Sequence, residues 1–203
     1  MNKTWIIASS NDGKFKEIKN FFGKKLSLIS MSDKNIPVCN EPFSTFIENA
    51  LHKARHVSRI TKMPTIADDS GLVVDVLKGK PGVKSSRFFQ GKTNLSRDEA
   101  NNNELLQRMQ VFQDPTQRSA YFVAVIVGLD NFDDPFPAIG IGTWHGKVLT
   151  KSIGTNGHGY DPVFFCPRAN KTAGQMSVNE KEKYSHRRLA LESLLKQLKL
   201  KNF

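Results

Sequence analysis

Residues 5–22, WIIASSNDGKFKEIKNFF, contain a strand, a polar turn and a helix in direct succession. Residues 5–8 form a short apolar run, which is typical of a buried strand. Residues 9–14 are small, polar or charged, and such residues commonly mark the start of a helix. Apolar side chains then recur at helical spacing, with Ile18 and Phe22 one turn apart. This stretch predicts a β-loop-α unit at the start of an α/β fold.

The rest of the chain continues to alternate between strand and helix patterns. Residues 121–129 are almost continuously apolar, which indicates a central strand buried on both faces, and residues 139–148 are expected to pair with them as a hairpin. The other expected elements are strands at 26–31 and on both sides of a turn at 68–71, and helices at 46–57 (capped by Ser44 or Thr45), 97–112 and 185–200. No repeat, linker or low-complexity segment divides the chain, so residues 1–203 are interpreted as a single domain in which any second lobe is interleaved with the first.

The composition is that of a globular protein with an excess of positive charge. Of the 203 residues, 38% are hydrophobic and 24% are charged, which excludes the disordered and fibrous classes. Lysine and arginine number 30 against 19 aspartate and glutamate residues, so the formal net charge is +11. This charge favours an anionic partner, and nucleic acid, an acidic membrane surface and a polyphosphate substrate are all compatible with it.

Several features of the sequence predict a soluble cytoplasmic protein with no membrane partner. The apolar run at residues 5–8 is too short for a signal peptide, and no apolar run is long enough to span a membrane. Cys39 and Cys166 are too few for a disulfide framework or a four-cysteine zinc site, and reduced thiols fit the cytosol.

Two glycine motifs that bind nucleotides are absent. The GKT at 91–93 would need glycine at position 86 to form a P-loop, and that residue is Ser86. Gly140 and Gly142 would need glycine at position 145 to form a dinucleotide fingerprint, and that residue is His145. Any nucleotide site must therefore be built differently.

The turn at 9–14 is a candidate anion site. It offers small residues and free backbone N–H groups at the start of a helix, with Lys14 at its end. An ordinary capped turn between a strand and a helix explains the same residues equally well. The turn by itself leaves both interpretations open.

Asp68 and Asp69 are adjacent carboxylates that follow a predicted buried strand. Two neighbouring negative charges are unfavourable unless a cation relieves them. Mg²⁺ prefers a few carboxylate oxygens together with water and substrate phosphates, so one aspartate and a loop glutamate would suit it, while the other aspartate could deprotonate a water molecule. An Asx-type turn or a contact with a helix dipole is the structural alternative.

Two further segments are compatible with a ligand that has a planar ring and negative charge. The loop GHGYD at 157–161 combines permissive glycines with two aromatic rings that could flank a base, although core aromatics in an ordinary turn would look the same. Lys181, His186 and Arg187 lie before or within the first turn of the last helix, where positive charge opposes the helix dipole unless an anion binds. Solvated basic residues are the alternative there.

Taken together, these segments resemble the Ham1 family, the inosine/xanthosine triphosphate pyrophosphatases that act on non-standard purine nucleotides. The resemblance covers nearly the whole chain and rests on five ordered blocks. They are IIASSNDGKFKEI, TFIENALHKARHVSRITKMPTIADDSGLVVDVL, GKPGVKSSRF, NGHGYDPVFF and NEKEKYSHRRLAL. The second block is long and specific, which makes a chance similarity untenable.

The resemblance implies a Mg²⁺-dependent hydrolase that cleaves ITP, dITP and XTP between the α and β phosphates. The products would be the nucleoside monophosphate and pyrophosphate, and the reaction would keep these nucleotides out of DNA and RNA. The implied fold is α/β, an elongated mixed β-sheet with flanking helices that form two lobes around a central cleft. A homodimer that binds a small nucleoside triphosphate, and no stable nucleic acid, is the implied assembly.

The resemblance also assigns roles to individual residues. Asp69 matches the proton acceptor for the attacking water, Asp68 supports the site, and Lys14 is the cation nearest the phosphates. Glu41 and Asp69 match the magnesium ligands. The residues matched to substrate binding, of which the last three read the purine, are Ser9, Ser10, Asn11, Asp12, Gly13, Lys14, Lys53, Ser70, His158, Gly159, Tyr160, Asp161, Lys181, His186 and Arg187.

Two positions depart from the family pattern. His158 stands where the family usually has phenylalanine, which predicts weaker or pH-dependent stacking on the base. Ser10 replaces a common glycine in the phosphate loop. Neither substitution falls on the metal carboxylates.

Two other functions compete with this hypothesis. A Maf-type pyrophosphatase acting on modified pyrimidine nucleoside triphosphates would use similar chemistry, and a panel of substrates separates the two. A basic nucleic-acid-binding module would explain the net charge. The sequence lacks the evenly spaced surface aromatics of an RNA platform and any zinc-finger or helix-turn-helix signature.

Overall fold

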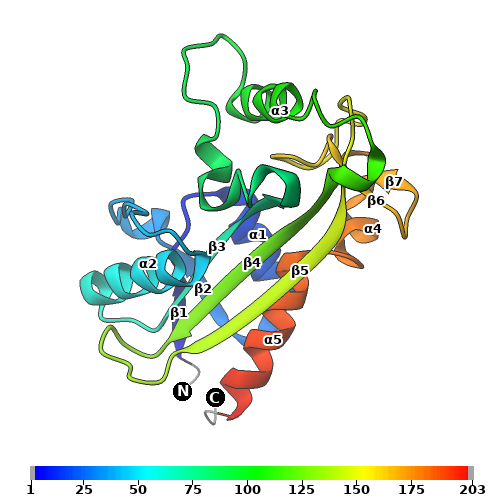
Figure 1. Ribbon diagram of the computed structural model, residues 1–203. Coiled ribbons are helices and arrows are strands. Elements are labelled where there is room, and N and C mark those ends of the chain that lie inside the picture. Colours follow the sequence, from blue (N-terminus) through cyan, green and yellow to red (C-terminus); the bar gives the residue numbers. More distant parts are fainter. Residues whose placement is uncertain (1–2, 201–203) are drawn as a thin grey trace. The chain divides into compact units, whose positions relative to one another are not determined.

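The computed structural model describes residues 3–200 (Figure 1). Its strands are β1 (Thr4–Ile7), β2 (Ser27–Ser30), β3 (Thr65–Val74), β4 (Ser119–Leu129), β5 (Ala138–Val148), β6 (Phe164–Cys166) and β7 (Lys171–Thr172), and its α-helices are α1 (Asp12–Phe22), α2 (Phe46–Thr61), α3 (Arg97–Arg108), α4 (Val178–Glu182) and α5 (His186–Leu200). The strands form one sheet in the order β2-β1-β3-β4-β5-β6-β7. Strand β1 is parallel to β2 and β3, whereas β6 is antiparallel to β5 and β7, so the expected mixed α/β fold is confirmed. Within residues 3–200, no helix has the length and apolar character needed to cross a membrane.

The chain divides into two compact units made of interleaved segments. Among the described residues, unit 1 contains 3–69, 124–142 and 187–200, and unit 2 contains 70–123 and 143–186. Strands β3, β4 and β5 contribute residues to both units. The expectation that a second lobe would be interleaved with the first is therefore confirmed.

Unit 1 has a core on each face of its strands. Successive residues of a strand point to opposite faces, and Trp5 and Ile7 accordingly pack with α1 and α5, whereas Ile6 and Ala8 pack with α2. Figure 1 shows α2 on one side of these strands and α1 and α5 on the other. The apolar run that predicted a buried strand is thus explained by helices on both of its faces.

Strand β3 runs without a break from Thr65 to Val74, so the turn expected at 68–71 is wrong. Aspartate, serine and glycine are depleted in strands, which is why the sequence favoured a turn. At Gly71 a side chain is sterically excluded, because a Cβ would overlap Ser85 Oγ and lie 2.5 Å from the carbonyl oxygen of Gly82. The consequence is that a rigid strand, rather than a loop, carries both carboxylates.

Gly140 of β5 lets helix α5 approach the sheet closely. A Cβ at this position would overlap the carbonyl oxygen of Ala190 and lie 2.6 Å from the backbone nitrogen of Leu194. Both atoms belong to the helix backbone and cannot move away independently. Gly140 belongs to the glycine pair that resembles part of a dinucleotide-binding motif in the sequence. In the structure its role is to allow this close contact between the strand and the helix.

We expect Gly140→Ala to lower the free energy of unfolding by roughly 1–3 kcal/mol, because the added methyl group overpacks the contact with α5. Urea denaturation followed by circular dichroism measures the change. Gly128→Ala is the matched control, since a Cβ there would meet Leu194 Cδ1 at an ordinary 3.5 Å. Equal stability of the two variants would contradict the proposed close approach.

Unit 2 is built around a core that includes Leu72 of β3, Leu105 of α3 and Phe164 of β6. The buried Arg118 fixes the segment that follows α3, since its guanidinium donates hydrogen bonds to four backbone carbonyls. These are the carbonyls of Met109 (3.0 Å), Phe112 (2.7 Å), Val148 (2.7 Å) and Leu149 (2.6 Å). Helix α3 is therefore held firmly within unit 2.

Candidate active site

The expected anion turn lies at the start of helix α1 in unit 1. Asn11 caps the helix, with its side-chain oxygen 3.1 Å from the backbone nitrogen of Lys14, and its own backbone N–H donates to Ser9 Oγ at 3.2 Å. Ser10, Asn11 and Asp12 are exposed. The turn thus presents a capped helix N-terminus, where backbone N–H groups favour negative charge.

Asp68 lies buried within a group of charged residues from α1 and α5. Its carboxylate accepts hydrogen bonds from Lys14 Nζ and, at 2.9 Å, from Arg187 Nε. Arg187 also donates to Glu17 Oε2 at 2.5 Å. Burial raises the pKa of Asp68, but the charges of Lys14 and Arg187 outweigh it and hold the pKa well below its usual range. Asp68 is therefore ionised and positions the two cations.

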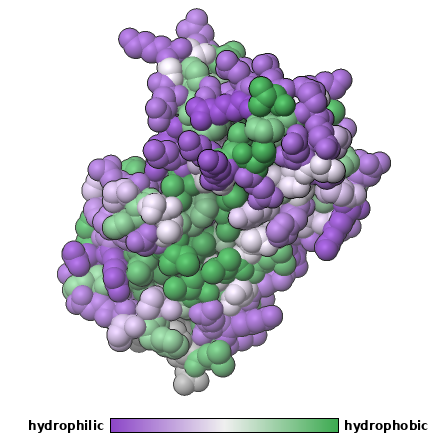
Figure 2. Space-filling view, viewed as in Figure 1, coloured by the Kyte–Doolittle hydropathy of each residue, from purple (hydrophilic) through white to green (hydrophobic). Residues whose placement is uncertain are grey.

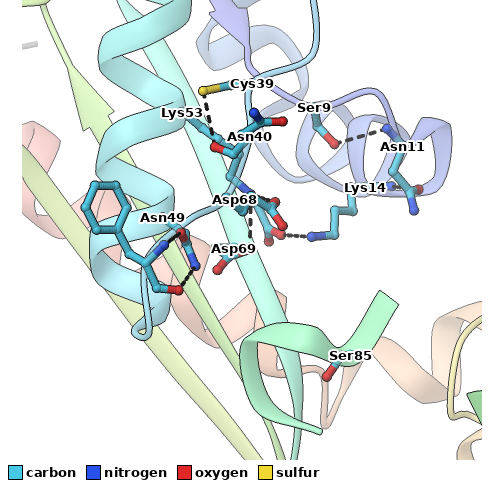
Figure 3. Close-up of polar contacts among 12 residues, drawn as sticks. Ser9, Asn11, Lys14, Cys39, Asn40, Asn49, Lys53, Asp68, Asp69 and Ser85 are labelled. Carbon is cyan, nitrogen blue, oxygen red and sulfur yellow. Dashed lines mark hydrogen bonds and ion pairs between the residues drawn. The ribbon is translucent and has the colours of Figure 1, made fainter. Parts of the chain in front are cut away.

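Asp69 faces the opposite side of β3, as strand alternation requires, and meets helix α2. Lys53 Nζ lies 3.1 Å from Asp69 Oδ1 and 2.7 Å from Glu41 Oε1. Burial lowers the pKa of Lys53, but the two carboxylates outweigh this and raise it above its usual value. Figure 3 shows Lys14 and Lys53 reaching the aspartates of β3 from two sides. Lys53 therefore joins the two carboxylates that the family resemblance assigns to magnesium.

The second oxygen of Asp69 suits a cation or a proton donor. Asp69 Oδ2 is buried and has no hydrogen-bond partner, and burial together with the charge of Glu41 outweighs the opposing effect of Lys53 and raises the pKa of the carboxyl. Within residues 3–200, no group of three or more His, Cys, Asp or Glu residues is arranged as a metal site. The unpartnered Asp69 Oδ2 and the nearby Glu41 are carboxylate donors of the kind that Mg²⁺ uses, since this ion commonly binds one or two carboxylates and takes its other ligands from water and phosphates.

Asn49 of α2 is fully buried. Its side chain accepts a hydrogen bond from the backbone nitrogen of Phe43 (3.0 Å) and donates one to the carbonyl oxygen of the same residue (3.1 Å). This pair of bonds ties the segment that carries Glu41 to α2 (Figure 3). Asn49 is a site residue that sequence reasoning missed.

The loop 157–161 belongs to unit 2 and is held mostly by its own polar groups. Asp161 Oδ2 accepts hydrogen bonds from the backbone nitrogen of His158 (2.9 Å) and from Lys181 Nζ (2.5 Å). The Tyr160 ring is buried in the core, and its hydroxyl donates to the carbonyl oxygen of Ser85 at 2.8 Å. Of the two rings in the loop, His158 is the exposed one.

His186 and Arg187 are adjacent in the chain but belong to different units. The His186 ring stacks on Phe122, with centroids 4.9 Å apart and planes 11° apart, inside unit 2. Arg187 joins the carboxylates of unit 1 instead, where only 3% of its surface is exposed. The resemblance assigns both residues to purine recognition, but His186 contacts unit 2 whereas Arg187 contacts the carboxylates of unit 1.

The matched residues fall into two groups. Unit 1 brings together Lys14, Lys53, Asp68, Asp69, Glu41 and Arg187, with Ser9, Ser10, Asn11, Asp12 and Gly13 in the adjoining turn. Unit 2 contains Ser70, His158, Gly159, Tyr160, Asp161, Lys181 and His186. Glu17 joins the first group although no sequence motif pointed to it. Its spacing of three residues from Lys14, which places both on one side of α1, is the signal that was available.

The chain is similar to known proteins over nearly its whole length. The chain is 43% identical over 197 residues to the dITP/XTP pyrophosphatase of Vibrio cholerae serotype O1, covering 96% of both chains, and 42% identical over 199 residues to the enzyme of that name from Nitrosomonas europaea, covering 98% of this chain and 95% of the relative. A HAM1 protein from Coxiella burnetii superposes with a TM-score of 0.88 at 36% identity, covering 98% of this chain and 100% of that one. The Staphylococcus aureus Ham1 protein gives a TM-score of 0.84, also at 36% identity and with the same coverage. Because the Ham1 family model matches residues 5–197 as well, the chain belongs to the Ham1 family.

Proposed function

We propose that this chain is a Mg²⁺-dependent pyrophosphatase that hydrolyses dITP, ITP and XTP to the nucleoside monophosphate and pyrophosphate. The full-length relatives described above carry the name dITP/XTP pyrophosphatase. The observation that carries the proposal is the state of Asp69, which has one oxygen bound to Lys53 and the other buried without a partner. Such a carboxylate is prepared for a cation or for the proton of an attacking water.

The cations of unit 1 are placed to bind the triphosphate. Burial lowers the pKa of Lys14, because the opposing effect of Asp68 does not fully offset the loss of hydration and the repulsion from Arg187 and Lys53. A negatively charged phosphate beside Lys14 would relieve that unfavourable charge. The turn 9–14, of which residues 10–12 are exposed, adds backbone N–H groups at the start of α1.

Asp69 is proposed to act as the general base. Water attacks phosphorus, Asp69 Oδ2 accepts the proton of that water, and the bond between the α and β phosphates breaks to release pyrophosphate. A carboxylate whose pKa is raised is a better proton acceptor than an ordinary aspartate. Positioning and charge neutralisation account for most of the acceleration in phosphoryl transfer, which matches a site made of lysines and carboxylates.

Magnesium is proposed to bind at Glu41 and Asp69. When bound, it would neutralise phosphate charge and polarise the reacting phosphoryl group. Lys53 contacts both carboxylates and holds them in place. The segment 41–43 is anchored by Asn49, so the geometry of the Glu41 carboxylate depends on that buried amide.

Lys181, His186 and the loop 157–161 are proposed to recognise the base. Hypoxanthine and xanthine carry a 6-oxo group that accepts hydrogen bonds, whereas the 6-amino group of adenine does not. Donors that would be left unpaired by the wrong base can reject it by orders of magnitude. The exposed His158 ring is the group in the loop that is available for stacking.

A substrate panel tests this function. We expect the purified protein with Mg²⁺ to convert ITP, dITP and XTP to the monophosphate and pyrophosphate, and to act on ATP at least about 100-fold more slowly. Release of orthophosphate, or equal rates on ATP, would refute the assignment. Preference for modified pyrimidine triphosphates would indicate Maf-type activity, and nucleic-acid binding at physiological salt without turnover would indicate a basic binding module.

Asn49→Ala is expected to weaken the apparent affinity for Mg²⁺ by about tenfold, because the segment carrying Glu41 loses both of its hydrogen bonds to α2. Titration of activity against Mg²⁺ concentration at saturating ITP measures the change. Asn20→Ala, in an exposed position of α1, is the control and should leave the titration unchanged. An unaltered Mg²⁺ titration for Asn49→Ala would show that the segment is positioned by other contacts.

We further propose that the protein forms a homodimer through an apolar face of unit 1. Figure 2 shows apolar side chains gathered over β4 and β5 beside α2. Ile139 packs in the core beneath α2, and Ile141, two residues further along the same face of β5, is 49% exposed. Light scattering should give twice the chain mass for the wild-type protein and a single-chain mass for Ile141→Asp. A wild-type monomer would contradict this proposal.

We also propose that the two units act as one catalytic domain. Three strands, β3, β4 and β5, each pass from one unit into the other. Unfolding of either unit would therefore disrupt strands whose other residues belong to the second unit. A single cooperative urea transition is the expected result.

A further inference from the structure

Helix α3 holds the tip of the loop 157–161 through two side chains that lie one helical turn apart. The backbone N–H of Gly159 donates to Asp98 Oδ2 at 2.6 Å, and Asn102 Nδ2 donates to the carbonyl oxygen of Gly159 at 2.9 Å. Gly159 has φ +63°, a left-handed backbone conformation. Because glycine also adopts other backbone conformations readily, further contacts are needed to keep the loop in this one. The two hydrogen bonds thus fix the peptide groups on both sides of this glycine.

These bonds complete the attachment of the loop within unit 2. Asp161, which binds Lys181, also accepts from the backbone nitrogen of His158, and the Tyr160 hydroxyl donates to Ser85. Gly159 lies between these anchored residues, next to the exposed His158 ring that is proposed to stack on the base. Asp98 and Asn102 therefore add contacts to Gly159, which the three bonds above do not include.

Neither side chain is needed to form α3 itself. Ser96 and Glu99 already supply a complete capping box, so the helix start does not depend on Asp98. Asn102 is 6% exposed, and its Oδ1 is buried without a hydrogen-bond partner, which is unfavourable. A leucine would fill a similar volume without that penalty. The amide has a specific task, which is its bond to Gly159.

Three consecutive asparagines in α3 show how specific this contact is. Asn101 binds the backbone nitrogen of Phe89 (2.9 Å) and the carbonyl oxygen of Ser86 (3.3 Å), which lie in a different loop. Asn102 binds Gly159, and Asn103 is exposed. The helix therefore provides matched control positions of the same residue type.

We propose that Asp98 and Asn102 are positioning residues that set the conformation of the loop 157–161 before the nucleotide binds, and thereby determine the affinity for the base. This inference rests on the proposed function. A loop already held in its binding conformation loses less entropy when the ligand arrives, so binding is tighter. The triphosphate is bound by residues of unit 1 and is not affected by this mechanism.

Steady-state kinetics separate a positioning role from a general loss of structure. We expect Asn102→Leu and Asp98→Ala to raise KM for ITP by about tenfold, with less change in kcat, because each removes one hydrogen bond to the loop. Inhibition by inorganic pyrophosphate, which has no base, should keep its wild-type Ki. A KM equal to that of the wild type, or a parallel loss of pyrophosphate affinity, would overturn the proposal.

Two variants serve as controls. Asp98→Asn keeps an oxygen that can accept from Gly159 and is expected to restore most of the affinity lost in Asp98→Ala. Asn103→Ala removes the same amide from the exposed neighbour and should behave as the wild type. Failure of Asp98→Asn to recover affinity would show that the charge of Asp98, rather than its hydrogen bond, matters.

Hydrogen exchange measured on the nucleotide-free protein tests the loop without any activity. Peptides covering 157–161 should exchange at least about threefold faster in Asn102→Leu than in the wild type, while those covering β4 stay unchanged. Unchanged exchange of the loop would contradict the positioning role. If the wild type does not hydrolyse ITP, the proposed function fails, and the exchange result still decides whether α3 holds the loop.

Discussion

Asp69→Asn is expected to lower kcat for ITP by about 10³-fold, because asparagine cannot accept a proton from the attacking water. The fold should be retained. Asparagine has nearly the same shape, its Oδ1 can still accept a hydrogen bond from Lys53, and Lys53 keeps its ion pair with Glu41. Turnover measured with saturating ITP and Mg²⁺, together with urea denaturation, checks both parts of this expectation.

Asp75→Asn is the matched control for this variant. Asp75 follows β3 and is exposed, so the same change of charge should leave activity and stability within the error of the wild type. Near-normal turnover of Asp69→Asn would show that another group accepts the proton. Loss of folding would show instead that the ion pair with Lys53 is structural.

Asp68→Asn is expected to lower the free energy of unfolding by about 3 kcal/mol, because it removes the buried carboxylate that pairs with both Lys14 and Arg187. Arg187 keeps its contact with Glu17, so Lys14 is affected most. Urea denaturation at pH 7 measures the loss. The double variant Asp68→Asn with Lys14→Met should recover part of it, since the unpaired ammonium is removed.

Additive losses in that double variant would contradict the coupling between Asp68 and Lys14. Glu192→Gln is a suitable control, because its ion pair with Arg188 lies on the exposed surface of α5 and contributes little. We expect this change to leave the urea midpoint almost unaltered. A large loss of stability in Glu192→Gln would mean that removal of any charge from unit 1, and not of the buried Asp68 in particular, destabilises the protein.

The stability that Asp68 provides has a defined dependence on pH. Its pKa is held below the usual range in the folded protein, whereas the unfolded chain has an ordinary value near 3.9. Because the pKa of Asp68 is lower in the folded protein than in the unfolded chain, the ionised carboxylate stabilises the fold. This contribution to the free energy of unfolding is complete above the pKa of the unfolded chain and is lost as the pH falls toward the pKa of the folded protein. The difference in the free energy of unfolding between the wild type and Asp68→Asn should therefore be constant from pH 6 to pH 8 and become smaller in strong acid.

Local patterns in the sequence were sufficient to predict most elements of unit 1. The apolar run at residues 5–8 and the helical spacing that follows it depend on neighbours in the chain, and both appear as β1 and α1. Thr45 caps α2 as expected, because a cap is made by residues three positions apart. The pairing of β4 with β5 also followed from closeness along the chain.

The prediction of secondary structure was wrong where contacts with residues distant in the sequence outweigh a local conformational preference. Asp68 and Asp69 favour a turn in isolation, yet they lie in a continuous strand because Lys14, Lys53 and Arg187 supply charges from other helices. Arg187 reaches Asp68 across 119 positions of the chain. No pattern of spacing encodes such a contact.

Buried polar residues show the same limit. Asn49 and Tyr160 look like surface or ligand-facing groups in the sequence, but Asn49 is fully buried and Tyr160 is 4% exposed. Each is buried because one specific backbone group, at Phe43 or Ser85, satisfies its hydrogen bonds. In contrast, the resemblance to the family, and the acidic, basic and loop residues that match its motifs, could be found from the sequence without a structure.

The α/β class, the basic charge and the resemblance to the Ham1 family could all be predicted without a structure, because periodicity, composition and ordered motifs are properties of the chain alone. The fold was needed to show that the two aspartates lie on opposite faces of β3, each paired with a different lysine, and that α3 holds the loop 157–161. Electrostatic and hydrogen-bond energies depend on distance and burial in space. Residues that are far apart in the chain acquire these energies only when the fold brings them together.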